Sequence, residues 1–165
     1  MAYYLGLDAG GTKTFCLIGD GNGEIKGFGR GGTGNYEGYG VEAAHQEIRR
    51  AVEGALESAG IRLEEIDAIG MGVAGADIPD DYDMLEREIF GPIFGDIPRM
   101  LRNDSMGGLR GGTRDPFGVV IACGTGCVCA GVNGDGKEVR IGGISEDYGD
   151  RVSGTSIGIH GLKAV

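Results

Sequence analysis

The sequence predicts an α/β fold in which a mixed sheet combines a three-stranded antiparallel meander with parallel strands and carries helices on both faces. The chain opens with three short apolar strands that are joined by glycine-rich turns. Helices and strands then alternate, which is typical of parallel strand pairing. From residue 117 the opening pattern of strand, glycine turn and strand returns. We therefore expect a second, related unit after the first.

The opening meander consists of three short apolar segments. Strands are expected over residues 3–8, 14–19 and 25–30. Gly10 and Gly11 form the first turn, and the second turn, over 20–23, has the Asp-Gly and Asn-Gly pairs that favour hairpins. A polar, glycine-rich loop over 31–40 should follow.

The alternating part begins with a helix over 41–59, whose apolar residues recur at helical spacing and which Gly60 should end. An apolar run over 66–73 predicts a buried strand. A second helix is expected over 80–90, closed by the Gly-Pro pair at residues 91–92.

A short strand over 98–102 should lead directly into Asn103 and Asp104. A short helix over 105–112 follows, and Asp104 or Ser105 can cap its N-terminus. Open α/β folds also place ligand groups at the carboxyl ends of their strands. Asp104 is therefore a candidate site residue as well as a candidate helix cap.

The segment from residue 117 repeats the opening pattern. Strands are expected over 117–123, 127–132 and 138–141, turns over 124–126 and 133–136, and a final helix over 155–165. We expect an N-terminal lobe over 1–115 and the beginning of a second, related lobe over 116–165. About 50 residues do not easily close a layered α/β domain. The chain is thus expected to be a fragment, or to be completed as a homo-oligomer or by a separate chain that supplies the second lobe.

The composition narrows the class of partner. The chain has 165 residues, 41% of them apolar, and a net charge of −10. This charge argues against nucleic acid or an anionic membrane as the main partner. No signal peptide or apolar span of about 20 residues is visible, so the cytoplasm is expected. The four cysteines, Cys16, Cys123, Cys127 and Cys129, all lie in apolar runs. A framework of structural disulfides is therefore not expected.

The first turn has the composition of a phosphate site. Its residues are Asp8, Gly10, Gly11, Thr12, Lys13 and Thr14. Glycines allow a backbone to approach a ligand closely, and successive N–H groups can bind an anion. The Asp8 carboxylate could hold a hydrated Mg²⁺, and the threonine hydroxyls could reach phosphate oxygens. An ordinary glycine-rich hairpin turn would use the same residues, so both interpretations stay open here.

Five segments carry a resemblance to a known family. Residues 8–14 resemble the first phosphate motif of the sugar kinase, Hsp70 and actin superfamily, and residues 123–126 (Cys-Gly-Thr-Gly) resemble its second. Residues 33–35 resemble a sugar-contacting loop, 103–105 the segment with the catalytic Asp, and 149–154 a glycine-rich stretch before a helix. Within the superfamily, the chain is most similar to the N-acetylglucosamine kinase and BadF/BadG/BcrA/BcrD-type ATPase family.

The resemblance implies a fold and an activity. The fold would be an actin-like, ribonuclease H-like lobe. The protein would be the N-terminal part of a kinase that transfers phosphate from ATP, with Mg²⁺, to a sugar hydroxyl, on an amino sugar such as N-acetylglucosamine. The adenine and ribose pocket of such kinases lies in the second lobe, of which only the beginning is expected here, so the chain alone is expected to have weak or no activity.

The resemblance also implies site residues. Asp104 would be the catalytic base, and Asp8 would hold Mg²⁺ through water. Nucleotide contacts would come from Asp8, Gly10, Gly11, Thr12, Lys13, Thr14, Gly124, Thr125 and Gly126. Sugar contacts would come from Asn35, Asn103, Asp104 and Asp150. Each of three residues also has a simpler structural interpretation. Asp104 can be a helix cap, Asn35 a left-handed turn residue and Lys13 a solvated surface lysine.

Two other functions stay open. One is an ATP-hydrolysing activator or regulatory subunit of the activase type, because Cys123 adjoins a Gly-Thr-Gly turn as the cluster-binding cysteine of activases does. The activases supply a second cysteine further along each chain, and none follows Cys129 here. The other is a non-catalytic, sugar-binding fragment.

Overall fold

The computed structural model describes residues 1–124, 126–144 and 151–165 and divides the chain into two compact units, Met1–Asp104 and Ser105–Val165. Helix α5 (Asp104–Gly112) begins with the last residue of the first unit. No helix in the described ranges combines the length and apolar character needed to cross a bilayer.

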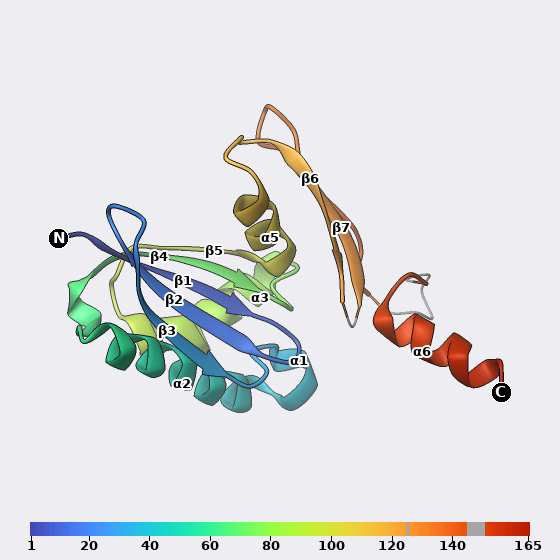
Figure 1. Cartoon of the computed structure of the whole chain (residues 1–165), viewed down its shortest axis with the longest axis horizontal. Coiled ribbons are helices and arrows are strands. Elements are labelled where there is room, and N and C mark those ends of the chain that lie inside the picture. Colours follow the sequence, from blue (N-terminus) through green and yellow to red (C-terminus); the bar gives the residue numbers. More distant parts are fainter. Residues whose placement is uncertain (125, 145–150) are drawn as a thin grey trace. The chain divides into compact units, whose positions relative to one another are not determined.

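The first unit is built on a five-stranded mixed sheet in the order β3-β2-β1-β4-β5 (Figure 1). Its strands are β1 (Tyr3–Ala9), β2 (Thr14–Asp20), β3 (Ile25–Gly31), β4 (Ile66–Val73) and β5 (Arg99–Asn103). The first three strands pair antiparallel, whereas β1–β4 and β4–β5 pair parallel. The predicted meander and its parallel extension are both confirmed.

The helices of this unit lie between its strands in sequence. They are α1 (Tyr36–Tyr39), α2 (Val41–Ala59), the 3₁₀ turn η1 (Leu63–Glu65), α3 (Pro79–Leu85), the π-helical turn η2 (Glu86–Phe90) and α4 (Gly91–Phe94). Helix α2 has the predicted limits and ends at Gly60, whose φ of 67° places it in the left-handed region. Its buried stripe consists of Ala44, Ile48, Ala51, Val52 and Ala55.

Within the first unit, α2, η2 and α4 pack on one face of the sheet (Figure 1). Leu5, Leu7 and Ala9 of β1 are buried in the core with residues of α2, η2 and α4. Tyr4, on the opposite face of the same strand, remains 48% exposed. Both parallel connections, from β3 to β4 and from β4 to β5, run in the same direction across the sheet. The right-handed rule for such connections therefore places their helices on the same face.

The second helix does not end where the sequence predicted. The glycine-proline pair at 91–92 was expected to close it, yet the chain continues through η2 and α4 to Phe94 and turns at Gly95, whose φ is 56°. The N–H of Gly91 bonds to the Glu86 carbonyl, five residues back. This wider turn accommodates Pro92, which has no N–H to donate and would otherwise crowd the preceding turn.

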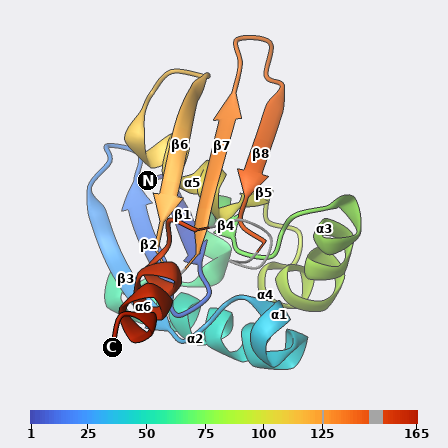
Figure 2. The same ribbon diagram turned by 90° about the vertical axis from the view of Figure 1, so that its right-hand side faces the viewer.

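The second unit contains an antiparallel sheet in the order β6-β7-β8, whose strands lie side by side in Figure 2. The strands are β6 (Gly118–Cys123), β7 (Cys127–Val132) and β8 (Glu138–Gly142). Helix α6 (Gly154–Lys163) follows, and the Ser153 hydroxyl caps it by accepting from the N–H of Ser156. The predicted strands and final helix are confirmed within one or two residues.

Strand β3 meets α2 through glycine alone. Gly27, Gly29 and Gly31 face the helix, and a Cβ on Gly29 would overlap the carbonyl oxygen of Ala51. The same Cβ would lie 2.5 Å from the backbone nitrogen of Ala55. The helix backbone therefore lies directly on the strand, and the position leaves no room for a side chain.

Replacing Gly29 by alanine should lower the free energy of unfolding by about 1–3 kcal/mol, because the methyl group must push α2 away from β3. Urea denaturation of the purified protein measures this loss. Gly6→Ala on β1 is the matched control, since a Cβ there meets nothing within 4 Å. Equal stability of the two variants would contradict the close packing of α2 on β3.

A buried carboxylate organises the turn between β2 and β3. Oδ1 of Asp20 accepts hydrogen bonds from the N–H groups of Asn22 (2.8 Å) and Glu24 (3.1 Å). Its other oxygen lies 3.1 Å from the Lys26 ammonium nitrogen. Burial favours the neutral acid, but the hydrogen bonds and the Lys26 charge outweigh it and lower the pKa of Asp20.

This lowered pKa makes the stability of the fold depend on pH. Because the folded-state pKa of Asp20 lies below its unfolded value of about 3.9, its contribution is present above that pH. It is lost as the pH falls through the folded-state pKa. We expect the melting temperature of Asp20→Asn to fall less steeply than that of the wild type below about pH 4. Parallel pH profiles of the two proteins would contradict this assignment.

Candidate functional site

The carboxyl ends of β1, β4 and β5 meet at one edge of the first sheet. Asp8 lies opposite Gly72 in the parallel register of β1 and β4, and Val73 lies opposite Asn103 in the register of β4 and β5. The Ala74 N–H donates to the Ala9 carbonyl (2.9 Å) just beyond the paired segment. Parallel strands in open sheets place ligand groups at this edge. The segments after β1, β4 and β5 are therefore neighbours.

The turn between β1 and β2 is tight and exposed. The Gly10 N–H donates to the Lys13 carbonyl (2.9 Å). The side chains of Thr12 and Lys13 are exposed, as is Gly11. The Lys13 ammonium lies 4.9 Å from the centre of the Phe15 ring, which places a positive charge beside the turn. The turn therefore presents backbone and a cation to solvent, as a phosphate site requires.

Thr14 differs from its neighbours because it is fully buried. Its hydroxyl donates to the Gly32 carbonyl (2.9 Å) in the loop that follows β3. Gly34 of that loop donates its N–H to the Gly10 carbonyl (3.0 Å). The loop after β3 is thus fastened to the β1–β2 turn, and the Thr14 hydroxyl serves this contact.

Asp8 is the ionisable group at the end of β1. Its side chain is exposed on the sheet face that carries no helix of the first unit. Desolvation by the surrounding chain raises the pKa of the Asp8 carboxyl, and the positive charge of Lys13 lowers it in part. A second positive charge at the site, such as a metal ion, would favour the carboxylate further.

Asn35 begins a short helix that the sequence did not predict. Its Oδ1 accepts the Glu37 N–H (2.9 Å) and its amide nitrogen donates to the Glu37 carboxylate (3.2 Å), which caps α1 within the expected loop 31–40. The alternative of a left-handed turn residue is wrong, because the φ of Asn35 is −82°. A Cβ on Gly75 would lie 2.9 Å from Oδ1 of Asn35, so the loop after β4 lies against this side chain.

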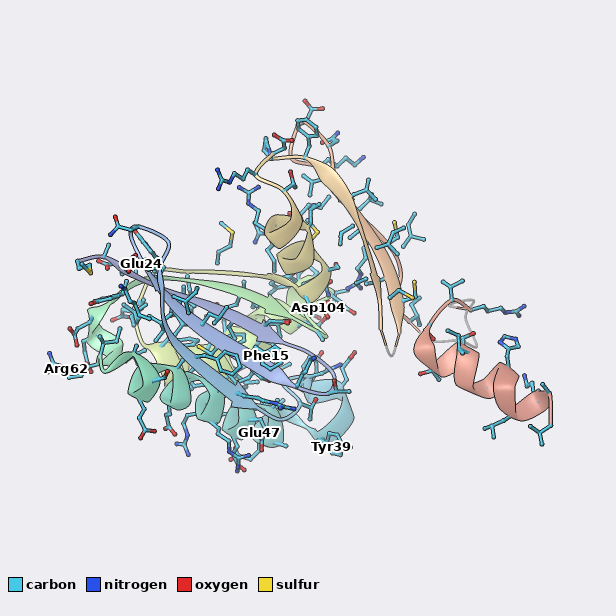
Figure 3. The ribbon with its side chains drawn as sticks, viewed as in Figure 1. Phe15, Glu24, Tyr39, Glu47, Arg62 and Asp104 are labelled. Carbon is cyan, nitrogen blue, oxygen red and sulfur yellow. The ribbon has the colours of Figure 1, made fainter. Side chains whose placement is uncertain are left out.

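Asn103 and Asp104 stand at the end of β5. Asn103 is 8% exposed, and its amide donates to Oδ1 of Asp77 (2.9 Å) in the segment after β4. Asp104, labelled in Figure 3, is half-buried where β5 passes into α5. It occupies the first turn of α5, where the helix dipole stabilises a carboxylate.

Sequence reasoning missed a hydrogen-bond network that joins Tyr36, Asp77 and Asp81. The Tyr36 hydroxyl donates to Oδ1 of Asp81 (2.7 Å), and Oδ2 of Asp81 accepts the N–H groups of Asp77 (3.0 Å) and Ile78 (2.9 Å). Burial and the hydrogen bond to Asp81 both raise the pKa of Tyr36, which keeps its hydroxyl a donor. With the bond from Asn103 to Asp77, the network ties the loop after β3 to the segments after β4 and β5.

The second glycine turn belongs to the other unit. The Gly124 N–H donates to the Gly126 carbonyl (2.9 Å), and the Gly124 carbonyl accepts the Gly154 N–H (2.8 Å). Thr125 and Asp150, the remaining expected site residues, lie outside the described residues. Gly124 and Gly126, which were expected to contact the nucleotide, are thus hydrogen-bonded to each other, and Gly124 also contacts the first residue of α6.

Comparison with known proteins places the chain in a family. The sequence profile of the BadF/BadG/BcrA/BcrD ATPase family matches residues 5–165. An N-acetylmuramic acid/N-acetylglucosamine kinase of Clostridium acetobutylicum is 33% identical over 99% of this chain and 53% of its own length. An N-acetyl-D-glucosamine kinase of Dictyostelium discoideum is 30% identical over 98% of this chain and 53% of its own length.

The fold has the same relatives. The crystal structure of a candidate N-acetylglucosamine kinase from Chromobacterium violaceum superposes with a TM-score of 0.81 at 25% identity, over 99% of this chain and 56% of that one. The chain therefore spans about half the length of the relatives it matches. The expected actin-like ATPase fold is confirmed. Since the family profile covers nearly all of the sequence, this chain belongs to the BadF/BadG/BcrA/BcrD ATPase family.

Proposed function

We propose that this polypeptide is the N-terminal part of a kinase that transfers the γ-phosphoryl group of ATP to a hydroxyl of an amino sugar such as N-acetylglucosamine. The observation that carries the proposal is the meeting of Asp8, the Asn35 loop and the Asn103–Asp104 segment around the carboxyl ends of β1, β4 and β5. Relatives that are 33% and 30% identical over almost the whole chain are kinases of such sugars.

Asp104 is the proposed catalytic base. Its carboxylate accepts the proton of the sugar hydroxyl while that oxygen attacks the γ-phosphorus and the bond to the bridging oxygen of ADP breaks. The position in the first turn of α5 supports this role, because a carboxylate there interacts favourably with the helix dipole. Asn103 precedes it and, with Asn35 and Asp150, is proposed to hydrogen-bond the sugar.

The turn over 10–13 is the proposed binding site of the polyphosphate. Its exposed backbone and the Lys13 ammonium offset negative charge, and Asp8 is the proposed carboxylate for Mg²⁺, bound through water. Bound Mg²⁺ neutralises charge that develops on the phosphate oxygens. Oxygen ligands of this kind suit Mg²⁺, which keeps most of its water shell. The second turn, with Gly124, Thr125 and Gly126, is proposed to complete the phosphate contacts.

The second lobe is proposed to come from further polypeptide, whether in the same protein or in a partner chain, because the relatives are about twice as long. We propose that residues 1–115 form the first lobe and residues 116–165 begin the second. On this proposal the 165-residue chain binds the sugar but turns over little or no ATP.

Sugar binding tests the proposal. N-acetylglucosamine at 100 times its dissociation constant should stabilise the wild type by about 2.7 kcal/mol, measured as a rise in melting temperature. Asp104→Ala should reduce this rise, because it removes the partner of the reacting hydroxyl. Glu64→Ala is a matched control, since Glu64 is an exposed acid before β4, at the opposite end of the sheet. Absence of any sugar effect on the wild type, or full turnover of sugar and ATP by this chain alone, would contradict the proposal.

Asp77 should act as a positioning residue for Asn103. Asp77→Ala leaves the buried Asn103 amide without this acceptor, so we expect a loss of about 1–3 kcal/mol in stability together with weaker sugar binding. Asp77→Asn retains a carbonyl oxygen for the same bond and should restore most of the sugar affinity. Thermal melts with and without sugar separate the two effects. An asparagine variant that binds sugar as weakly as the alanine variant would argue against positioning through this bond.

A further inference from the structure

Two cysteines face each other across the hairpin that carries the second glycine turn. Cys123 ends β6, Cys127 begins β7, and the two are direct partners in the antiparallel register. Cys129 lies two residues further along β7, opposite Ile121. Because side chains alternate along a strand, all three cysteines are on the same face of the sheet.

The Cys123–Cys127 pair occupies a position without backbone hydrogen bonds between its members. The neighbouring pair is joined by the bond from the Gly124 N–H to the Gly126 carbonyl. The Cys127 carbonyl instead accepts the Gly143 N–H, at the end of β8 on the other side of β7. In antiparallel sheets such pairs have Cα atoms about 4.5 Å apart. Disulfides span Cα separations of about 4.4–6.8 Å, so this pair is within reach of one.

The thiols of Cys123 and Cys127 are accessible to solvent, whereas Cys16 in the first unit is not. Cys123 is exposed and its thiol donates to the Val152 carbonyl (2.7 Å), while Cys127 is half-buried. Cys16 is buried, and burial raises the pKa of its thiol to about 12. A reagent in solution should therefore reach the cross-strand pair and not Cys16.

We propose that Cys123 and Cys127 form a redox modification site, a dithiol that a low-molecular-weight disulfide such as glutathione disulfide converts to a cross-strand disulfide. The Cys123 thiolate attacks one glutathione sulfur, and the other glutathione leaves as a thiol. The Cys127 thiolate then attacks the Cys123 sulfur and releases the second glutathione. Two protein thiols are oxidised, one glutathione disulfide is reduced to two glutathione molecules, and both protein protons are transferred to them.

The resulting ring would enclose residues 124–126. It would join β6 to β7 at the base of the glycine turn and restrict the conformations that the turn can adopt. The disulfide would form independently of any kinase activity, because the geometry of the hairpin alone brings the two thiols together.

Differential alkylation of the native 165-residue protein tests the site. After incubation with glutathione disulfide, free thiols are blocked with a first reagent, disulfides are reduced, and the released thiols are labelled with a second. Cleavage after Arg114 and Lys137 yields one peptide with all three cysteines of the hairpin, and fragmentation assigns each label. We expect the second label on Cys123 and Cys127, the first label on Cys129, and Cys16 labelled only after unfolding.

Single substitutions identify which two cysteines form the disulfide. Cys129→Ser should give the same yield of disulfide as the wild type, whereas Cys123→Ser should abolish it. Repeating the oxidation in urea should distribute the second label among all the cysteines, because the cross-strand geometry is lost. A native protein with no intramolecular disulfide, with a disulfide through Cys129, or with the label distribution of the unfolded chain would overturn the proposal.

Discussion

The pairing of the central strand is the constraint on which the rest of the first unit depends. β1 pairs antiparallel with β2 and parallel with β4, so its carboxyl end meets both the β1–β2 turn and the segment after β4. The parallel register of β5 then places Asn103 beside this edge. A shift of one residue would move Leu5, Leu7 and Ala9 out of the core. The hydrophobic pattern that stabilises the sheet thereby also positions the candidate site.

The glycines of β3, at the edge of the sheet opposite β5, also help to position the loops of the candidate site. They allow α2 to lie on the strand backbone, and α2 connects the loop around Asn35 to β4. Gly32 is held by both the Thr14 hydroxyl and the Glu47 carboxylate of α2 (2.6 Å). Glu47, labelled in Figure 3, thus joins the helix to the loop that is hydrogen-bonded to the β1–β2 turn.

Much of the fold could be predicted from the sequence, because glycine turns and apolar periodicity are local signals. The limits of α2, β4 and β7 are the predicted ones. The prediction failed at the Gly91–Pro92 pair and at α1, where a π-helical turn and a side-chain cap decided the outcome. In the site, Asp77 and Asp81 were missed because their roles come from partners far along the chain, Asn103 and Tyr36. Only the end of β4 before Asp77 and the position of Asp81 in the first turn of α3 could have indicated them.

Mapping the backbone amide resonances of the labelled protein during titration with N-acetylglucosamine tests the central claim most directly. The account predicts that the largest shifts fall on residues at the carboxyl ends of β1, β4 and β5, including Asn35, Asp77 and Asn103. Shifts confined to the opposite end of the sheet, around Asp20 and Glu64, or no shifts at sugar concentrations that saturate the relatives, would contradict it.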